Sequence, residues 1–277
     1  MKIVNCYFPG ARFPSVSVTG SDCDLRCPHC AGLSLSAMLP AKTPEALLSL
    51  ARKLSDDGAL GFLLSGGCNS YGVVPLRRFI GAIRSIKEET GLRINAHIGY
   101  PGREDLRELV GTGVDSFSIT FPMSDRIGSE VLGIENALSR YDETTNGLLE
   151  AGGRFVPHAL VGLGSEQEDI AGLERLASHE PKSLVVIAFI PMKGTPLSGA
   201  SSSADDGIVR RLASARDLMP RANIVLGCMR PRGRVELEKT LIEEFLDGIV
   251  MPNAAALRAL SGRVSAKRFE GCCAVYL

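Results

Sequence analysis

The fold is decided by a repeating unit, and its clearest copy is the stretch TPEALLSLARKLSDDGALGFLLSGG, residues 43–67. An N-cap, a proline at the first helical position and an acid in the first turn start a helix at Thr43, which is predicted to run to about Ser55. The apolar run Gly61–Ser65 then indicates a buried strand, which ends at Gly66-Gly67. A helix followed by a buried strand is the building unit of an α/β fold.

The same unit recurs along the chain. The predicted strands cover residues 15–19, 61–65, 93–98, 114–120, 154–163, 184–190, 222–226 and 247–251. The predicted helices cover residues 43–55, 76–89, 103–110, 167–177, 205–219, 236–245 and 254–260, and one more ends near residue 151. Strands separated by helices of this length imply right-handed crossovers and a parallel sheet. Eight strands favour a parallel (β/α) barrel, either a full (β/α)8 barrel of the TIM type or a (β/α)6 core with extra units.

We expect a single domain that spans residues 1–277. The length matches that of one barrel domain, and no linker, low-complexity tract or internal repeat divides the chain. Residues 1–14 are expected to form an N-terminal extension, and residues 262–277 a C-terminal tail that carries cysteines. In a barrel, both segments can fold over one mouth.

Charge and hydropathy limit the partners. Lys plus Arg and Asp plus Glu number 31 each, so the formal net charge is zero and no basic field favours nucleic acid or an anionic membrane. The first residues lack a signal peptide, and no apolar run approaches the roughly 20 residues of a membrane helix. We therefore expect a cytoplasmic protein with no nucleic-acid partner and no membrane association.

Three of the eight cysteines lie in one loop, Ser21–Cys30, directly after the first predicted strand. The spacing of Cys23, Cys27 and Cys30 lets this loop turn all three thiols inward, where they suit a soft metal or an iron–sulfur centre. A structural zinc site would be closed by four protein ligands, whereas an iron–sulfur cluster with one unligated iron can bind and activate a small molecule. A metal loop completed by a distant residue, or a chance cluster of thiols, is the alternative.

This loop resembles the cluster-binding loop of the radical S-adenosylmethionine (SAM) enzymes, which has the spacing Cys-x3-Cys-x2-Cys after a first strand. The resemblance implies that Cys23, Cys27 and Cys30 are the catalytic ligands of a 4Fe-4S cluster. It also implies that the open iron chelates SAM and cleaves it reductively to a 5′-deoxyadenosyl radical. His29 departs from the family pattern, which usually has an aromatic residue before the third cysteine.

Three later stretches strengthen the resemblance. Ser65-Gly66-Gly67 lies where these enzymes carry a glycine-rich motif, usually Gly-Gly-Glu, whose backbone meets the amino group of SAM; here Cys68 replaces the acid. Val161–Glu166 resembles the fifth-strand motif of the biotin-synthase-like branch, in which glycines such as Gly162 let the backbone approach the adenine. Phe189–Leu197 is similar to the sixth-strand ending of that branch. Taken alone, a double glycine would suit any tight strand-to-helix turn.

By analogy with that branch, polar residues at the third and fourth strand ends are candidates for contacts with SAM. Asn95 and His97 alternate on one face of the third strand, and Ser116 and Ser118 on one face of the fourth. Arg140 resembles an arginine associated with binding of the SAM carboxylate. For the four strand residues, polar filling of the barrel interior is the alternative.

The cysteines outside the loop bear on the class of reaction. Cys228 follows the seventh predicted strand, and the pair Cys272-Cys273 lies in the tail. Exposed adjacent thiols are a liability without a use. We therefore expect Cys228, Cys272 and Cys273, with Cys6 as a further member, to bind a second, auxiliary iron–sulfur cluster. Cys68 competes with Cys6 for the fourth ligand position.

Two such clusters resemble those of biotin synthase and lipoyl synthase, which give up sulfide from the second cluster as the sulfur inserted into unactivated C–H bonds. The chain is most similar to the archaeal-type, two-protein lipoyl synthase. That resemblance implies an octanoylated carrier protein or a small molecule as substrate, a sister radical SAM subunit, and an electron donor such as ferredoxin. The alternatives are another radical SAM reaction of this branch (rearrangement, methylation or cofactor assembly) and a non-enzymatic iron–sulfur or metal-binding protein.

Overall fold

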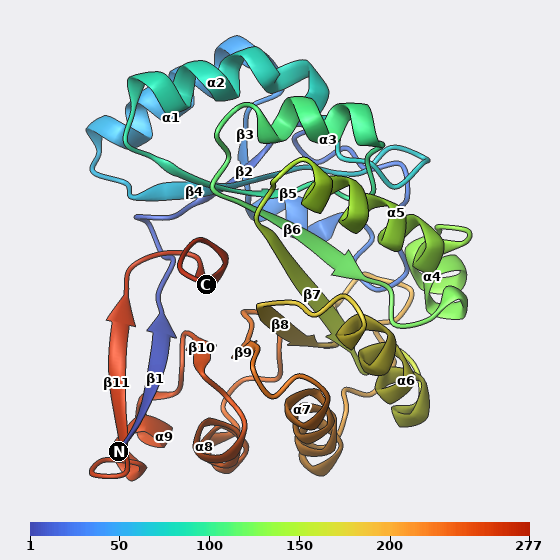
Figure 1. Ribbon diagram of the computed structural model, residues 1–277, viewed down its shortest axis with the longest axis vertical. Helices are drawn as coiled ribbons and strands as arrows, with labels where there is room; N and C mark the ends of the chain where they lie inside the picture. The colour runs from blue at the N-terminus through green and yellow to red at the C-terminus, as the bar shows by residue number, and fades with distance from the viewer.

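The computed structural model describes residues 1–277. Its centre is one sheet of 11 strands, all paired in parallel, which curls so that helices cover its outer face (Figure 1). The strands are β1 Lys2–Tyr7, β2 Ser15–Ser17, β3 Leu39–Pro40, β4 Gly61–Ser65, β5 Arg93–His97, β6 Ser116–Phe121, β7 Phe155–Val161, β8 Ser183–Ala188, β9 Asn223–Leu226, β10 Gly248–Val250 and β11 Val264–Phe269. The α-helices are α1 Pro44–Asp56, α2 Ile80–Glu89, α3 Arg103–Val110, α4 Asp125–Leu132, α5 Ala137–Glu150, α6 Glu166–Ala177, α7 Asp205–Leu218, α8 Val235–Glu244 and α9 Ala254–Ala259.

The eight predicted strands are confirmed, and they stand in the sheet in their order along the chain, from β2 through β4 to β10. The sheet does not close on itself, however. β10 pairs with β1 and β1 with β11, so β11 and β3 form the two edges. The architecture is therefore a curled, open α/β barrel instead of the closed (β/α)8 form.

The two terminal segments supply this difference. Residues 1–14 contain β1 and residues 262–277 contain β11, and these two strands pair over their whole length, from Lys2 with Val264 to Tyr7 with Phe269. After β11 the chain turns back to the 3₁₀ turn η3 (Cys273–Val275), which contacts β5 and β6. The backbone oxygen of Val275 accepts hydrogen bonds from the side chains of Arg93 and Arg154. Arg93 is the first residue of β5, and Arg154 directly precedes β7. The tail thus closes the amino end of the barrel.

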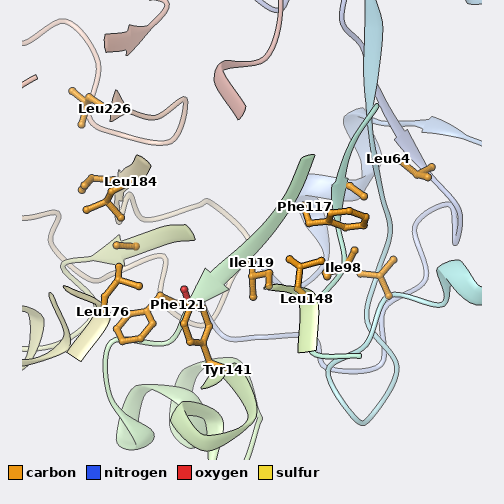
Figure 2. Packing of buried hydrophobic residues seen from close by; sticks show 14 of the residues in the cluster. Leu64, Ile98, Phe117, Ile119, Phe121, Tyr141, Leu148, Leu176, Leu184 and Leu226 are labelled. Atoms are coloured by element: carbon orange, nitrogen blue, oxygen red, sulfur yellow. The ribbon is translucent and has the colours of Figure 1, made fainter. Parts of the chain in front are cut away.

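The core lies between the sheet and the helices. Side chains alternate along a strand, so Phe117, Ile119 and Phe121 of β6 all point outward and join a core of 51 buried residues (Figure 2). The ring of Phe121 lies 4.8 Å from that of Tyr141 in α5, nearly perpendicular to it. The alternate residues face inward, and several of them are polar. The inner face is therefore where functional groups gather.

Side-chain caps explain where two of the predicted helices begin. The Thr43 hydroxyl accepts a hydrogen bond from the Ala46 N–H at 3.1 Å at the start of α1. Ser165 and Glu168 form a capping box at the start of α6, directly after the loop that follows β7. No helix combines the length and the hydropathy needed to cross a membrane.

Candidate metal centre

The cysteine loop lines a cavity of about 200 Å³ at the carboxyl ends of β2, β4 and β5. The functional groups in its wall are three loop cysteines, the strand end Ser65-Gly66-Gly67, Cys68 and His97. The wall also contains His29 and Tyr100, and the apolar side chains of Leu25, Leu35, Val74, Leu132 and Ile134. Sequence-predicted residues from three separate segments therefore meet in one place.

Two of the thiols and a histidine are already close enough to share a metal. One ligand atom each of Cys27, His29 and Cys30 lies within 4.8 Å of the others. The backbone N–H of Cys30 donates to the Cys27 carbonyl at 3.0 Å, which forms the turn that brings them together. A hydrogen bond from Cys27 lowers the pKa of Cys30 to about 4, and a hydrogen bond from His29 adds to this effect. The thiolate is the form that binds iron, so Cys30 is prepared for ligation. The same hydrogen bond, together with burial, raises the pKa of Cys27, which therefore keeps its proton until a metal displaces it.

The loop backbone is held in an uncommon conformation on both sides of this turn. Arg26 and Ala31 have φ angles of 41° and 47°, in the left-handed region that residues with a Cβ rarely adopt. Such strain persists only where the surroundings impose it, and it concentrates at functional sites. Here the two strained residues lie on either side of Cys27 and Cys30, where the backbone reverses direction around the thiols.

The double glycine at the end of β4 packs directly against this loop. The N–H of Gly67 donates to Thr19 Oγ1 at 2.7 Å, and the N–H of Asp24 donates to the Cys68 carbonyl at 2.9 Å. A Cβ on Gly67 would lie 2.0 Å from the carbonyl oxygen of Asp22 and 2.6 Å from the Cα and Cβ of Cys23. Only glycine allows this approach, so the glycine at this position is explained by the geometry.

The strand residues divide between the cavity and the tail. Both serine hydroxyls, Ser116 and Ser118, donate to Asn95 Oδ1, at 3.0 and 2.9 Å. Asn95 Nδ2 in turn donates to the Cys272 sulfur at 3.5 Å. None of the three lines the cavity, so the structure places them as an internal polar network that holds the tail.

His97, one step further along β5, does line the cavity. Its ring centroid lies 4.9 Å from that of His158 on β7. Burial lowers the pKa of His97 to about 3 and that of His158 to about 4, so both imidazoles are neutral. His158 Nδ1 lies 3.2 Å from the carbonyl oxygen of Val156. A carbonyl oxygen can only accept, so this hydrogen bond requires the proton on Nδ1. No sequence motif marks His158, although period-two alternation places it on the inner face.

Arg140 lies outside this cavity. Its guanidinium donates to the carbonyl of Tyr71 and stacks 5.9 Å from the Tyr100 ring, and it lines a different cavity of about 600 Å³ with Arg103 and Glu143. The structure therefore does not bring Arg140 to the cysteine loop, because Tyr100 lies between the two cavities and contributes to both. The contact of Arg140 with the SAM carboxylate stays a prediction.

Gly162 is held at the end of β7, beyond the residues that line the cavity. It has a φ of 89°, and its N–H donates to the buried carboxylate of Asp169 at 2.9 Å. Arg211 of α7 pairs with that same carboxylate, and both side chains are almost completely buried. Sequence reasoning missed this pair, because nothing in the pattern of either helix marks them as partners.

The second group of cysteines is brought together only in part. Cys272 and Cys273 share a hydrogen bond that lowers the pKa of Cys272 and raises that of Cys273. Cys228 keeps solvent-accessible surface, but surrounding atoms exclude enough water to raise its pKa, and the charge on Cys272 raises it further. Cys6 does not join them. It packs in the helix-facing core, while its neighbour Tyr7 faces the inner cluster that contains Cys273.

The amino-acid sequence was compared with protein families and with curated proteins. No protein-family model matches the chain. Biotin synthase 2 of Paracoccus denitrificans is 26% identical over 231 residues, which cover 80% of this chain and 71% of that protein. The biotin synthase of Wolinella succinogenes is 28% identical over 213 residues, 76% of this chain and 75% of that protein.

Two solved structures share the fold. The FeFe-hydrogenase maturase HydG from Carboxydothermus hydrogenoformans superposes with a TM-score of 0.64 at 19% identity, over 90% of this chain and 58% of that one. Methylornithine synthase, PylB, superposes with a TM-score of 0.65 at 17% identity, over 90% of this chain and 71% of that one. The chain thus spans little more than half of HydG.

These comparisons support a relationship to the biotin-synthase-like radical SAM enzymes, through relatives that are 26% and 28% identical. Among solved structures with this fold, SuiB of Streptococcus suis is bound to S-adenosylmethionine, and TsrM of Kitasatospora setae holds a 4Fe-4S cluster. The residues present fit both groups. Three thiols line a single cavity, one of them with a strongly lowered pKa, and His29 Nδ1 is buried there without a hydrogen-bond partner. Cys23, Cys27 and Cys30 would hold the cluster, and the Ser65-Gly66-Gly67 backbone would border the SAM.

Proposed function

We propose that this radical SAM enzyme inserts sulfur into unactivated C–H bonds, in the manner of lipoyl synthase, with an octanoylated carrier protein as substrate. The observation that carries the proposal is the position of the tail cysteines. Cys272 is hydrogen-bonded to Asn95, and Asn95 lies two residues before His97 in the wall of the cluster cavity. A second group of thiols thus faces the same interior as the first.

The second group would supply thiols to an auxiliary iron–sulfur cluster, although its sulfurs do not all lie within 4.8 Å of one another as the ligand atoms of Cys27, His29 and Cys30 do. Cys228, Cys272 and Cys273 supply three thiols, and the hydrogen bonds to Cys272 favour its thiolate. Asn95 would donate to the ligating sulfur, as outer residues around metal sites commonly do. Because Cys6 faces the helices, we leave it out of the ligand set.

The protein around the two centres favours chemistry that must avoid water. When bound, the first cluster and SAM would supply a 5′-deoxyadenosyl radical able to remove hydrogen from a methylene group. The chain contributes a wall with apolar side chains such as Leu132 and Ile134, and with the neutral imidazole of His97, which packs against the neutral His158 behind it. A carbon radical held in such a cavity would meet a bound sulfur before solvent.

The partners follow from the same proposal. The first cluster needs an electron donor such as ferredoxin, and a sister radical SAM subunit would share the two sulfur insertions. A small-molecule substrate in place of the carrier protein would keep the same residues in the same roles.

Iron and sulfide analysis after anaerobic reconstitution tests the second cluster. We expect about eight iron atoms per chain for two four-iron clusters, and about four after the triple change of Cys228, Cys272 and Cys273 to Ala. Cys6→Ala is the matched control and should keep the iron content of the unchanged protein. Equal iron contents in all three proteins would refute the auxiliary cluster and favour another radical SAM reaction.

The reaction itself is tested with SAM, a reductant and an octanoyl-lysine peptide under anaerobic conditions. Mass spectrometry should show replacement of hydrogen by sulfur in the octanoyl chain, together with 5′-deoxyadenosine. Formation of 5′-deoxyadenosine without gain of sulfur would retain the radical SAM class and reject this substrate. Absence of 5′-deoxyadenosine from a protein with a full iron content would favour a non-enzymatic iron–sulfur protein.

A further inference from the structure

A fourth thiol lies in the wall of the cluster cavity. Cys68 follows the double glycine, and it lines the cavity together with Cys23, Cys27 and Cys30. Its backbone carbonyl accepts a hydrogen bond from Asp24 at 2.9 Å, so the end of β4 is attached to the cysteine loop at this residue. The Cys68 thiol itself has no hydrogen-bond partner among the side-chain hydrogen bonds of the protein.

The attachment of Cys68 to the loop leaves it little freedom to lie elsewhere. Gly67 approaches Asp22 and Cys23 so closely that no Cβ fits between them. The Cys68 side chain is partly buried, and burial, with the charges of Cys23 and Cys30, raises its pKa to about 12, so the free thiol keeps its proton. A soft, uncommitted ligand atom is thus fixed beside a three-thiol centre that has one coordination position to fill.

We propose that the Cys68 thiolate is a displaceable fourth ligand, which binds the open iron of the cluster when SAM is absent and leaves it when SAM binds. The proposal rests on the radical SAM cluster and is independent of sulfur insertion. When the bond from sulfur to iron forms, the thiol proton passes to solvent. When the amino and carboxylate groups of SAM take its place, the thiolate takes up a proton again. No electron is transferred in either direction.

Such a ligand would protect the centre between turnovers. Four thiolates give a closed site, whereas an open iron is exposed to water and other small molecules. The same residue would also set the apparent affinity for SAM. SAM can bind only while Cys68 is off the iron, so the apparent Kd equals the intrinsic Kd divided by the fraction of time for which Cys68 is off. Cys68 stands where the family usually has an acid, so this device would distinguish the chain from its relatives.

Electron paramagnetic resonance of the dithionite-reduced protein tests the proposal without any octanoyl substrate. We compare the unchanged protein with Cys68→Ala and Cys68→Ser, and use Cys6→Ala as the matched control for loss of a buried thiol. The SAM-free spectra of both Cys68 variants should differ from that of the unchanged protein, and all spectra should coincide at saturating SAM. If Cys68 is bound about nine-tenths of the time, Cys68→Ala should tighten the Kd for SAM about tenfold.

Each other outcome contradicts the proposal. Identical SAM-free spectra would mean that Cys68 does not bind iron. Weaker binding of SAM by Cys68→Ala would mean that the thiol contacts SAM itself. Loss of the cluster from both variants, with normal far-ultraviolet circular dichroism, would make Cys68 a permanent ligand.

Discussion

Replacement of Gly67 by alanine is the sharpest test of how the end of β4 and the cysteine loop are joined. The added methyl would lie 2.0 Å from the carbonyl oxygen of Asp22 and 2.6 Å from the Cα of Cys23. These are backbone atoms, which cannot turn away as the end of a flexible side chain can. The loop must therefore move away from the strand, and Cys23 moves with it.

Overpacking of this kind usually costs about 1–3 kcal/mol, and contact with backbone favours the upper end of that range. A loss of about 3 kcal/mol would lower the Tm by roughly 6–12 °C for a domain of this size. The cluster should suffer more than the fold, because a displaced Cys23 no longer meets the other two thiols. We expect Gly67→Ala to bind less than half of the iron of the first cluster.

The assay combines urea denaturation of the metal-free protein with iron analysis after reconstitution. Gly81→Ala is the matched control, since a Cβ on Gly81 in α2 meets no atom within 4 Å. In a helix interior that change should be neutral or stabilise the protein by up to about 1 kcal/mol. If Gly67→Ala keeps both its urea midpoint and its iron content, the proposed contact between strand end and loop is wrong.

Three further changes test other parts of the structure. Asp169→Ala removes the nearer and more buried of the two carboxylates that pair with Arg211 and leaves Glu166 at 3.8 Å, so the free energy of unfolding should fall by about 3 kcal/mol in urea; a loss below about 1 kcal/mol would contradict the buried pair. Burial lowers the pKa of His158 from 6.5 to about 4, so below pH 6.5 the unfolded state binds the proton and stability falls as the pH drops toward 4. His158→Gln should therefore lose less stability than the unchanged protein between pH 7 and pH 5, and parallel urea midpoints would refute this. Cys6→Ala should keep its full iron content, whereas a loss of iron would return Cys6 to the ligand set.

The order and direction of the central strands could be predicted because each of them is a buried apolar run between helices with clear start signals. β1 and β11 could not be predicted in this way. Residues 264–269 include Lys267 and Arg268, and the strand is half exposed at the edge of the sheet. Its regular structure depends on pairing with β1, which is more than 250 residues away in the chain. Pairing over such a distance leaves no local pattern.

The site was predictable to the extent that its residues lie on one loop or one strand end. The three loop cysteines, the double glycine and His97 meet as expected, because carboxyl ends of parallel strands share one edge. The role of Cys6 depended on which face of a strand it occupies. Adjacent residues on a strand point to opposite faces, so Cys6 could be assigned only once Lys2–Tyr7 was known to be a strand.

The tail occupies the interior at one end of the open barrel. Arg93 and Arg154 hold the carbonyl of Val275 at the amino ends of their strands, and Asn95 holds Cys272 one step further in. With that end filled, the interior opens on the side of the cysteine loop, where the cavity lies. Cys228, which follows β9, is exposed, so the second group of cysteines borders solvent as well as the interior.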